Sequence, residues 1–83
     1  MIPENIIHQN ILDAIARIDN EGVPPYRKAK NWAVLYNRSH YPCKLLVSWA
    51  SVFANGEELN YKSFISEEAR PYLIERGFKV LAI

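Results

Sequence analysis

The sequence predicts a small α+β domain in which a three-stranded sheet packs on helices, in the order helix, strand, strand, helix, helix, strand. Three observations predict this class. Apolar residues recur at helical spacing near the start of the chain, two short runs of β-forming residues flank a turn, and the chain ends in a further run of strand type. With 83 residues, the chain has room for one domain, residues 1–83, and not for two ordinary ones.

The first helix is expected from Glu4 to Asn20. Its apolar side chains fall three and four residues apart and form one stripe, made of Ile7, Ile11, Ala14, Ile15 and Ile18. Pro3 suits the first helical position, because that position needs no N–H donor and the ring fixes a helical φ. Gly22 can adopt the left-handed conformation that ends a helix, and the two prolines that follow prevent a restart.

A β-hairpin is expected next. The run Trp32–Tyr36 is rich in β-forming residues, and Asn37-Arg38 is a plausible two-residue turn. Arg38 is a poor residue for the positive φ that such a turn requires. The return strand is predicted to be short, from Ser39 to Tyr41, since Pro42 has no N–H for a ladder.

The second half of the chain predicts more helix and a last strand. A helix from Cys43 to Ala54 is apolar around most of its circumference, which is typical of a helix at the centre of a core. Helical residues are also expected from Ser66 to Ala69 and from Tyr72 to Arg76, with Pro71 either separating two helices or bending one. The apolar run Phe78–Ile83 should pair with the hairpin or with another chain.

Composition and charge exclude several classes of protein. The chain is 49% apolar and carries ten basic against nine acidic residues, so it is not intrinsically disordered. Its single cysteine allows no internal disulfide. No apolar run approaches the length of a membrane span, and the first residues do not have the pattern of a signal peptide. We therefore expect a cytoplasmic protein that does not contact membrane.

The residue inventory predicts no catalytic residues, no metal site, no cofactor and no small-molecule substrate. Nucleophilic catalysis needs a nucleophile, a base and an orienting group, and the candidates are only His8, His40, Cys43 and scattered carboxylates. His40 and Cys43 supply two metal ligands, whereas structural zinc takes four. Cys43 is either a thiol whose pKa is lowered at a helix start or a small core residue, and the second interpretation is favoured.

The strongest signal is a basic segment. Five basic residues and no acidic one fall between positions 27 and 44, interleaved with aromatic residues. Basic side chains neutralise phosphates and aromatic faces stack on bases, so this segment is a candidate nucleic-acid interface. Arg38, at the hairpin tip, and Lys44, at a helix start, should lie close together. The alternative is a solvated surface loop with Trp32 and Tyr36 in the core. The predicted nucleic-acid-binding residues are Arg27, Lys28, Lys30, Arg38, Tyr41 and Lys44, with Tyr41 as a stacking or positioning residue.

A set of spaced residues extends over nearly the whole chain. It comprises Gly22-x-Pro24-Pro25, Tyr36, Tyr41-Pro42-x-Lys44, Ala50, Ala54-x-Gly56-x-x-Leu59, Phe64 and Leu73-x-x-x-Gly77-Phe78. This pattern resembles the N-terminal head domain of McrA-like, HNH-type restriction endonucleases that act on modified DNA. The sequence departs from that pattern at Arg38, at Cys43 and at Ile65-Ser66. The resemblance implies a non-catalytic accessory module in a DNA-related context and no nuclease activity.

Two functions therefore follow as expectations. The first is an accessory domain that contacts DNA phosphates through its basic segment. The second is a protein-interaction or homodimerisation module, because two Trp, five Tyr, an all-round apolar helix and a terminal strand give more apolar surface than a small core readily hides.

Overall fold

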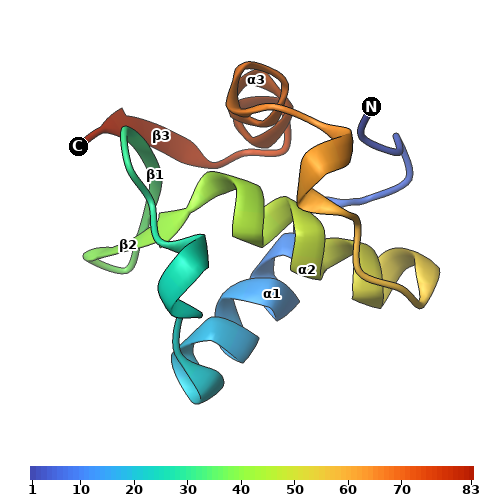
Figure 1. Ribbon diagram of the computed structural model, residues 1–83, viewed down its shortest axis with the longest axis horizontal. Coiled ribbons are helices and arrows are strands. Elements are labelled where there is room, and N and C mark those ends of the chain that lie inside the picture. The colour runs from blue at the N-terminus through green and yellow to red at the C-terminus, as the bar shows by residue number, and fades with distance from the viewer.

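Helix α2 (Cys43–Asn55) runs through the middle of the fold (Figure 1). The structure is a computed structural model that describes residues 1–83. Helix α1 (His8–Glu21) packs along one side of α2 and helix α3 (Ser66–Glu75) along the other, with the sheet at one end. Eight of the 13 residues of α2 are buried, which confirms that the helix with apolar residues on nearly every side is central to the core.

The sheet has three strands, β1 (Trp32–Tyr36), β2 (Ser39–Pro42) and β3 (Lys79–Ala82), in the order β2-β1-β3. Both pairings are antiparallel, and the fully buried Val34 of β1 lies opposite Tyr41 of β2. The last strand therefore pairs with the hairpin of its own chain. The α+β class and the predicted order of elements are confirmed.

The hairpin turn is made by Asn37 and Arg38, whose φ angles are 48° and 67°. Positive φ at both central residues is the geometry of a two-residue turn that matches the twist of the flanking strands. The turn forms although Arg38 is unsuited to it, because the pairing of β1 with β2 leaves only two residues to connect the strands. Tyr36 pairs with Ser39, and Leu35 pairs with His40.

Arg38→Gly is expected to stabilise the protein by about 0.5–1 kcal/mol. The substitution removes the steric cost of left-handed backbone, about 1–2 kcal/mol, and part of that gain is offset by the greater freedom of glycine in the unfolded chain. Urea unfolding measures the difference. Arg38→Ala is the control, since it removes the same charge and keeps a Cβ; equal stability of the two variants would contradict this explanation.

The first helix begins at His8, so the predicted start at Glu4 is wrong, and Pro3 lies outside the helix. The local sequence favours a helix from Glu4 onward, but the carbonyl groups of this segment accept hydrogen bonds from a distant side chain instead. Arg76 donates from Nε to the Ile6 carbonyl at 2.6 Å and from Nη2 to the Glu4 carbonyl at 3.2 Å. Bonded to a charged group outside the helix, these carbonyls are held in the non-helical path of this segment, which disfavours an earlier helix start.

The remaining segments follow the predictions more closely. Pro71 lies inside a single helix, α3, so the residues on either side of it do not form two separate helices. Two short 3₁₀ helices, η1 (Pro25–Arg27) and η2 (Tyr61–Ser63), interrupt the connections before β1 and before α3. None of the helices combines the length and the apolar character needed to cross a membrane.

Candidate anion-binding cleft

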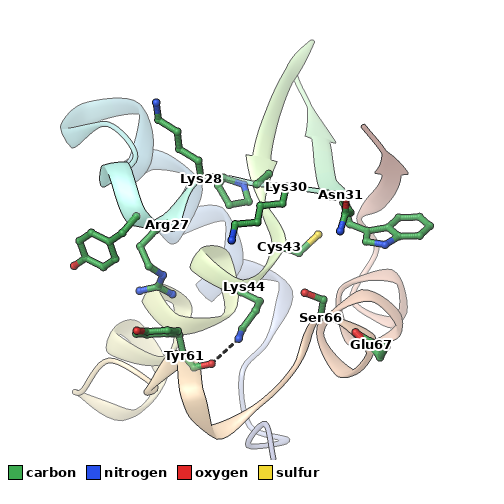
Figure 2. Close-up of a pocket in the computed structure, with 13 residues that line it drawn as sticks. Arg27, Lys28, Lys30, Asn31, Cys43, Lys44, Tyr61, Ser66 and Glu67 are labelled. Atoms are coloured by element: carbon green, nitrogen blue, oxygen red, sulfur yellow. Dashed lines mark hydrogen bonds between the residues drawn. The ribbon is translucent and has the colours of Figure 1, made fainter.

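A cleft of about 390 Å³ opens between η1, the segment that leads to β1, and the first turns of α2 and α3. Its charged lining residues are four basic side chains and one carboxylate: Arg27, Lys28, Lys30, Lys44 and Glu67. Figure 2 shows these side chains around the start of α2. Because the first turns of two helices also line it, backbone N–H groups without intrahelical partners lie at the same place as the cations.

Prolines at two points of the sequence position the basic residues. Pro25 begins η1, and its fixed φ turns the chain so that Lys28 and Lys30 follow along one wall of the cleft. Pro42 ends β2 and is the N-cap of α2, which puts Lys44 in the first turn of that helix. The local sequence thus brings together residues from positions 28 to 44.

Arg27 is not a free cation. Only 6% of its side chain is exposed. It donates from Nη2 to Ser48 Oγ at 3.0 Å, and its Nη1 lies 3.5 Å from Glu58 Oε2. The guanidinium also lies over the ring of Tyr61, with 5.0 Å from Cζ to the ring centroid. The prediction that Arg27 contacts phosphates directly therefore needs correction: it fixes the cleft wall and contributes positive charge from below the surface.

Lys44 is the innermost of the lysines. Its Nζ donates to the Tyr61 carbonyl, a bond drawn in Figure 2. Burial lowers the pKa of Lys44, the positive charge of Arg27 lowers it further, and the carboxylate of Glu67 opposes both effects. A lysine whose charge is disfavoured in this way gains from a bound anion, because the anion restores the favourable interaction that burial removed.

Lys28 and Lys30 are exposed and have no ion-pair partner. In Figure 2, the side chain of Lys30 turns toward Lys44, whereas that of Lys28 extends away from it. One lysine is thus placed to act within the cleft and one to extend its positive charge along the rim.

Two predicted site residues lie outside this group. Arg38 is at the hairpin tip, and Lys44 follows the opposite end of the hairpin. The prediction that these two residues lie close together is therefore wrong, and Arg38 does not line the cleft.

Tyr41 is 5% exposed, and its hydroxyl donates to Asp19 Oδ1 at 2.6 Å. Burial and this carboxylate raise the pKa of Tyr41. Its ring is therefore unavailable for stacking on a base, and it ties β2 to α1.

Cys43 lines the cleft but is buried, which fits the favoured interpretation of a small core residue. Burial raises the pKa of its thiol to about 11, and the nearby charge of Arg70 offsets only part of that effect. The thiol is therefore neutral at physiological pH, and the helix start does not make it a thiolate.

Sequence reasoning missed the second wall of the cleft. This wall is formed by Tyr61 of η2 together with Ser66 and Glu67 at the start of α3. These residues are more than 15 positions from Lys44 in the sequence, and no local pattern indicates that they approach it. The one signal in the sequence that points to this wall is Tyr61-Lys62, an aromatic residue followed by a basic one, as in Tyr26-Arg27.

Comparisons of the chain with known protein families, with curated proteins and with solved structures find no match.

Proposed function

We propose that this protein is a non-catalytic, cytoplasmic accessory domain that binds the phosphate backbone of nucleic acid in the cleft between η1 and the first turns of α2 and α3. Lys28, Lys30 and Lys44 would contact phosphates. The observation that carries the proposal is the gathering of these three lysines and Arg27 around one cleft that contains a single carboxylate. The sequence resemblance to the head domains of McrA-like restriction endonucleases supports DNA as the polymer.

The charge distribution favours a polyanion over a neutral ligand. The net charge of the chain is only +1, so the cleft concentrates positive charge that the rest of the surface balances. Arg27 is already neutralised in part by Glu58, whereas the exposed amines of Lys28 and Lys30 have no such partner. Phosphate groups would supply the missing counter-charge and release bound cations into solution.

Binding to a short fluorescent DNA strand is expected to weaken with salt. Three lysine contacts give a log–log slope of about −2 on a single strand and about −2.7 on a duplex. Lys28→Glu/Lys30→Glu is expected to weaken binding by about tenfold or more at low salt, because each substitution places a like charge beside the phosphates. Fluorescence anisotropy at two salt concentrations measures both effects.

Arg38→Glu/Lys79→Glu is the matched control. Both of its residues are exposed and outside the cleft, and this pair changes the net charge by the same amount as the test pair. The control should bind like the unmodified protein. Equal weakening by both pairs would indicate diffuse attraction to overall charge, and an affinity that does not change with salt would exclude phosphate binding. Arg27 is left unchanged, because replacing a buried guanidinium would disturb the fold.

The alternative is a homodimerisation or protein-interaction module. Much of the apolar surface that predicted it is used within one chain, since α2 is central and β3 pairs with β1. The observation that still favours it is the sheet itself, in which β2 and β3 are edge strands with one free side each. Sedimentation at high protein concentration tests this function: a stable dimer would support it, and a monomer would count against it.

A further inference from the structure

Two exposed tyrosines border the same cleft as the lysines. Tyr26 is 78% exposed, the highest value for any aromatic residue in the chain, and Tyr61 is 40% exposed. Each comes from a short 3₁₀ helix, η1 or η2, on a different stretch of the sequence. Neither ring belongs to the hydrophobic core.

The backbones of both tyrosines are ordered before any ligand arrives. Tyr26 is in the middle of η1, directly after Pro24 and Pro25, so its backbone has little freedom to lose. Tyr61 is fixed from three sides: Arg27 lies over its ring, Lys44 donates to its carbonyl, and the Asn60 side chain closes the turn by accepting from Lys62 N–H. A backbone that is ordered in advance lowers the entropic cost of binding at the side chains it carries.

The combination of lysines and exposed tyrosine rings in one cleft favours single-stranded over double-stranded nucleic acid. A duplex offers only phosphates, sugars and groove edges, because its base faces are stacked inside. A single strand offers phosphates and free base faces together, and grooves that bind it combine cations with aromatic platforms. The cleft, at about 390 Å³, is at the small end of the range that holds one ligand molecule, about 300–1,000 Å³.

We infer that the cleft binds single-stranded nucleic acid, with a base stacked on Tyr26, a second aromatic contact at Tyr61, and the adjoining phosphates on Lys30 and Lys44. The inference rests on the proposed phosphate binding and adds the class of ligand to it. Lys28, which extends away from the other lysines, would contact the strand as it leaves the cleft.

The test compares two labelled strands of equal length, a 12-nucleotide oligothymidylate and an abasic strand that has the same phosphates and no bases. The unmodified protein is expected to bind oligothymidylate at least about fivefold more tightly than the abasic strand, since one stacked base contributes about 1–3 kcal/mol, or roughly 5- to 150-fold. Tyr26→Ala should lose most of that preference, with Tyr61 accounting for the remainder, and bind the abasic strand as before. Tyr26→Phe, which keeps the ring, should retain the preference.

A duplex of the same length is the third ligand, and it should bind more weakly than oligothymidylate at the same salt concentration. Equal binding of the oligothymidylate and abasic strands, tighter binding of the duplex, or an equal effect of Tyr26→Ala on both strands would overturn the inference. These outcomes differ from failure of the proposed function, in which Lys28→Glu/Lys30→Glu would leave every ligand unaffected. An oligouridylate strand then tells RNA from DNA as the preferred single strand.

Discussion

Leu46→Ala is expected to destabilise the protein by about 3–5 kcal/mol. Leu46 is fully buried in α2, the helix that contacts α1, α3 and the hairpin. Because these elements also pack on other parts of α2, none of them can shift to fill the space that a smaller side chain would leave. Truncation removes the transfer free energy of the lost methyl groups and leaves a cavity. A domain of 83 residues has a total stability of roughly 4–12 kcal/mol, so this one change removes a large part of it. Urea unfolding followed by far-UV circular dichroism measures the loss.

Phe53→Ala is the matched control on the same helix. Phe53 is 45% exposed, so its side chain loses less buried contact, and we expect its removal to cost about 1–2 kcal/mol, well below the loss for Leu46→Ala. A comparable loss for the two variants would mean that α2 is not the centre of the core. If Leu46→Ala does not fold at all, Leu46→Val provides a smaller deletion at the same position and should cost about 0.5–1.5 kcal/mol, whereas unchanged stability would contradict tight packing around Leu46.

Arg76→Ala is expected to destabilise the protein by about 2–4 kcal/mol and to loosen the first seven residues, although Ile2 and Ile6 remain as apolar anchors. The Arg76 side chain is 13% exposed, and besides its bonds to the Ile6 and Glu4 carbonyls it donates to the Tyr72 carbonyl at 3.2 Å. Its Cζ lies 3.4 Å from the centroid of the Tyr72 ring. Hydrogen bonds from a charged donor contribute about 1.5–3 kcal/mol each, and several on one side chain are not additive.

Amide hydrogen exchange separates this effect from a general loss of stability. In Arg76→Ala, exchange should accelerate most at Ile7, Asn10 and Ile11, whose amides make the hydrogen bonds at the start of α1, next to the segment that Arg76 holds. Arg17→Ala is the control, because Arg17 also lies over an aromatic ring, Trp49, at 3.9 Å, but its ion pair with Glu21 is at the surface. That variant should lose less than about 1 kcal/mol. Uniform acceleration across the chain in Arg76→Ala would contradict a role specific to the N-terminal segment.

The same variant tests why the sequence-based start of the first helix was wrong. The residues from Glu4 onward have helical spacing and an acidic residue where the helix dipole favours one. Without the Arg76 guanidinium, the carbonyls of Glu4 and Ile6 are free to accept helical bonds. Backbone chemical shifts in Arg76→Ala should therefore show a fraction of helical character before His8, in a segment that is otherwise loosened, because one extra helical turn is only partly populated.

Most of the fold could be predicted because each element has a local cause. The apolar spacing of α1, the all-round apolar character of α2 and the β-forming run of β1 are properties of consecutive residues. The hairpin also followed from sequence, even though Arg38 adopts a φ of 67° that its side chain disfavours. Local preferences failed where a distant group competed for the same backbone atoms, as Arg76 does at the start of α1.

The candidate site was predicted only in part. The basic segment indicated Lys28, Lys30 and Lys44, and these three line one cleft. The sequence could not reveal that Arg27 is held by Ser48 or that Tyr41 is held by Asp19, since each pair is more than 20 positions apart. Charge and aromatic character are visible in a sequence, whereas burial, which decides whether a cation or a ring can reach a ligand, depends on what packs over it.

The sequence by itself determined the order of the elements, the central place of α2 and the positive charge of the segment before it, because these depend on residue type and short spacing. Only the tertiary structure decided which basic residues stay free, which tyrosines remain exposed, and which wall faces the lysines. Tyr61 and Glu67 reach the cleft through the packing of η2 and α3 against α2. The physical reason is that a hydrogen bond or a buried face is a relation between two distant segments, and the packing of the core sets that relation.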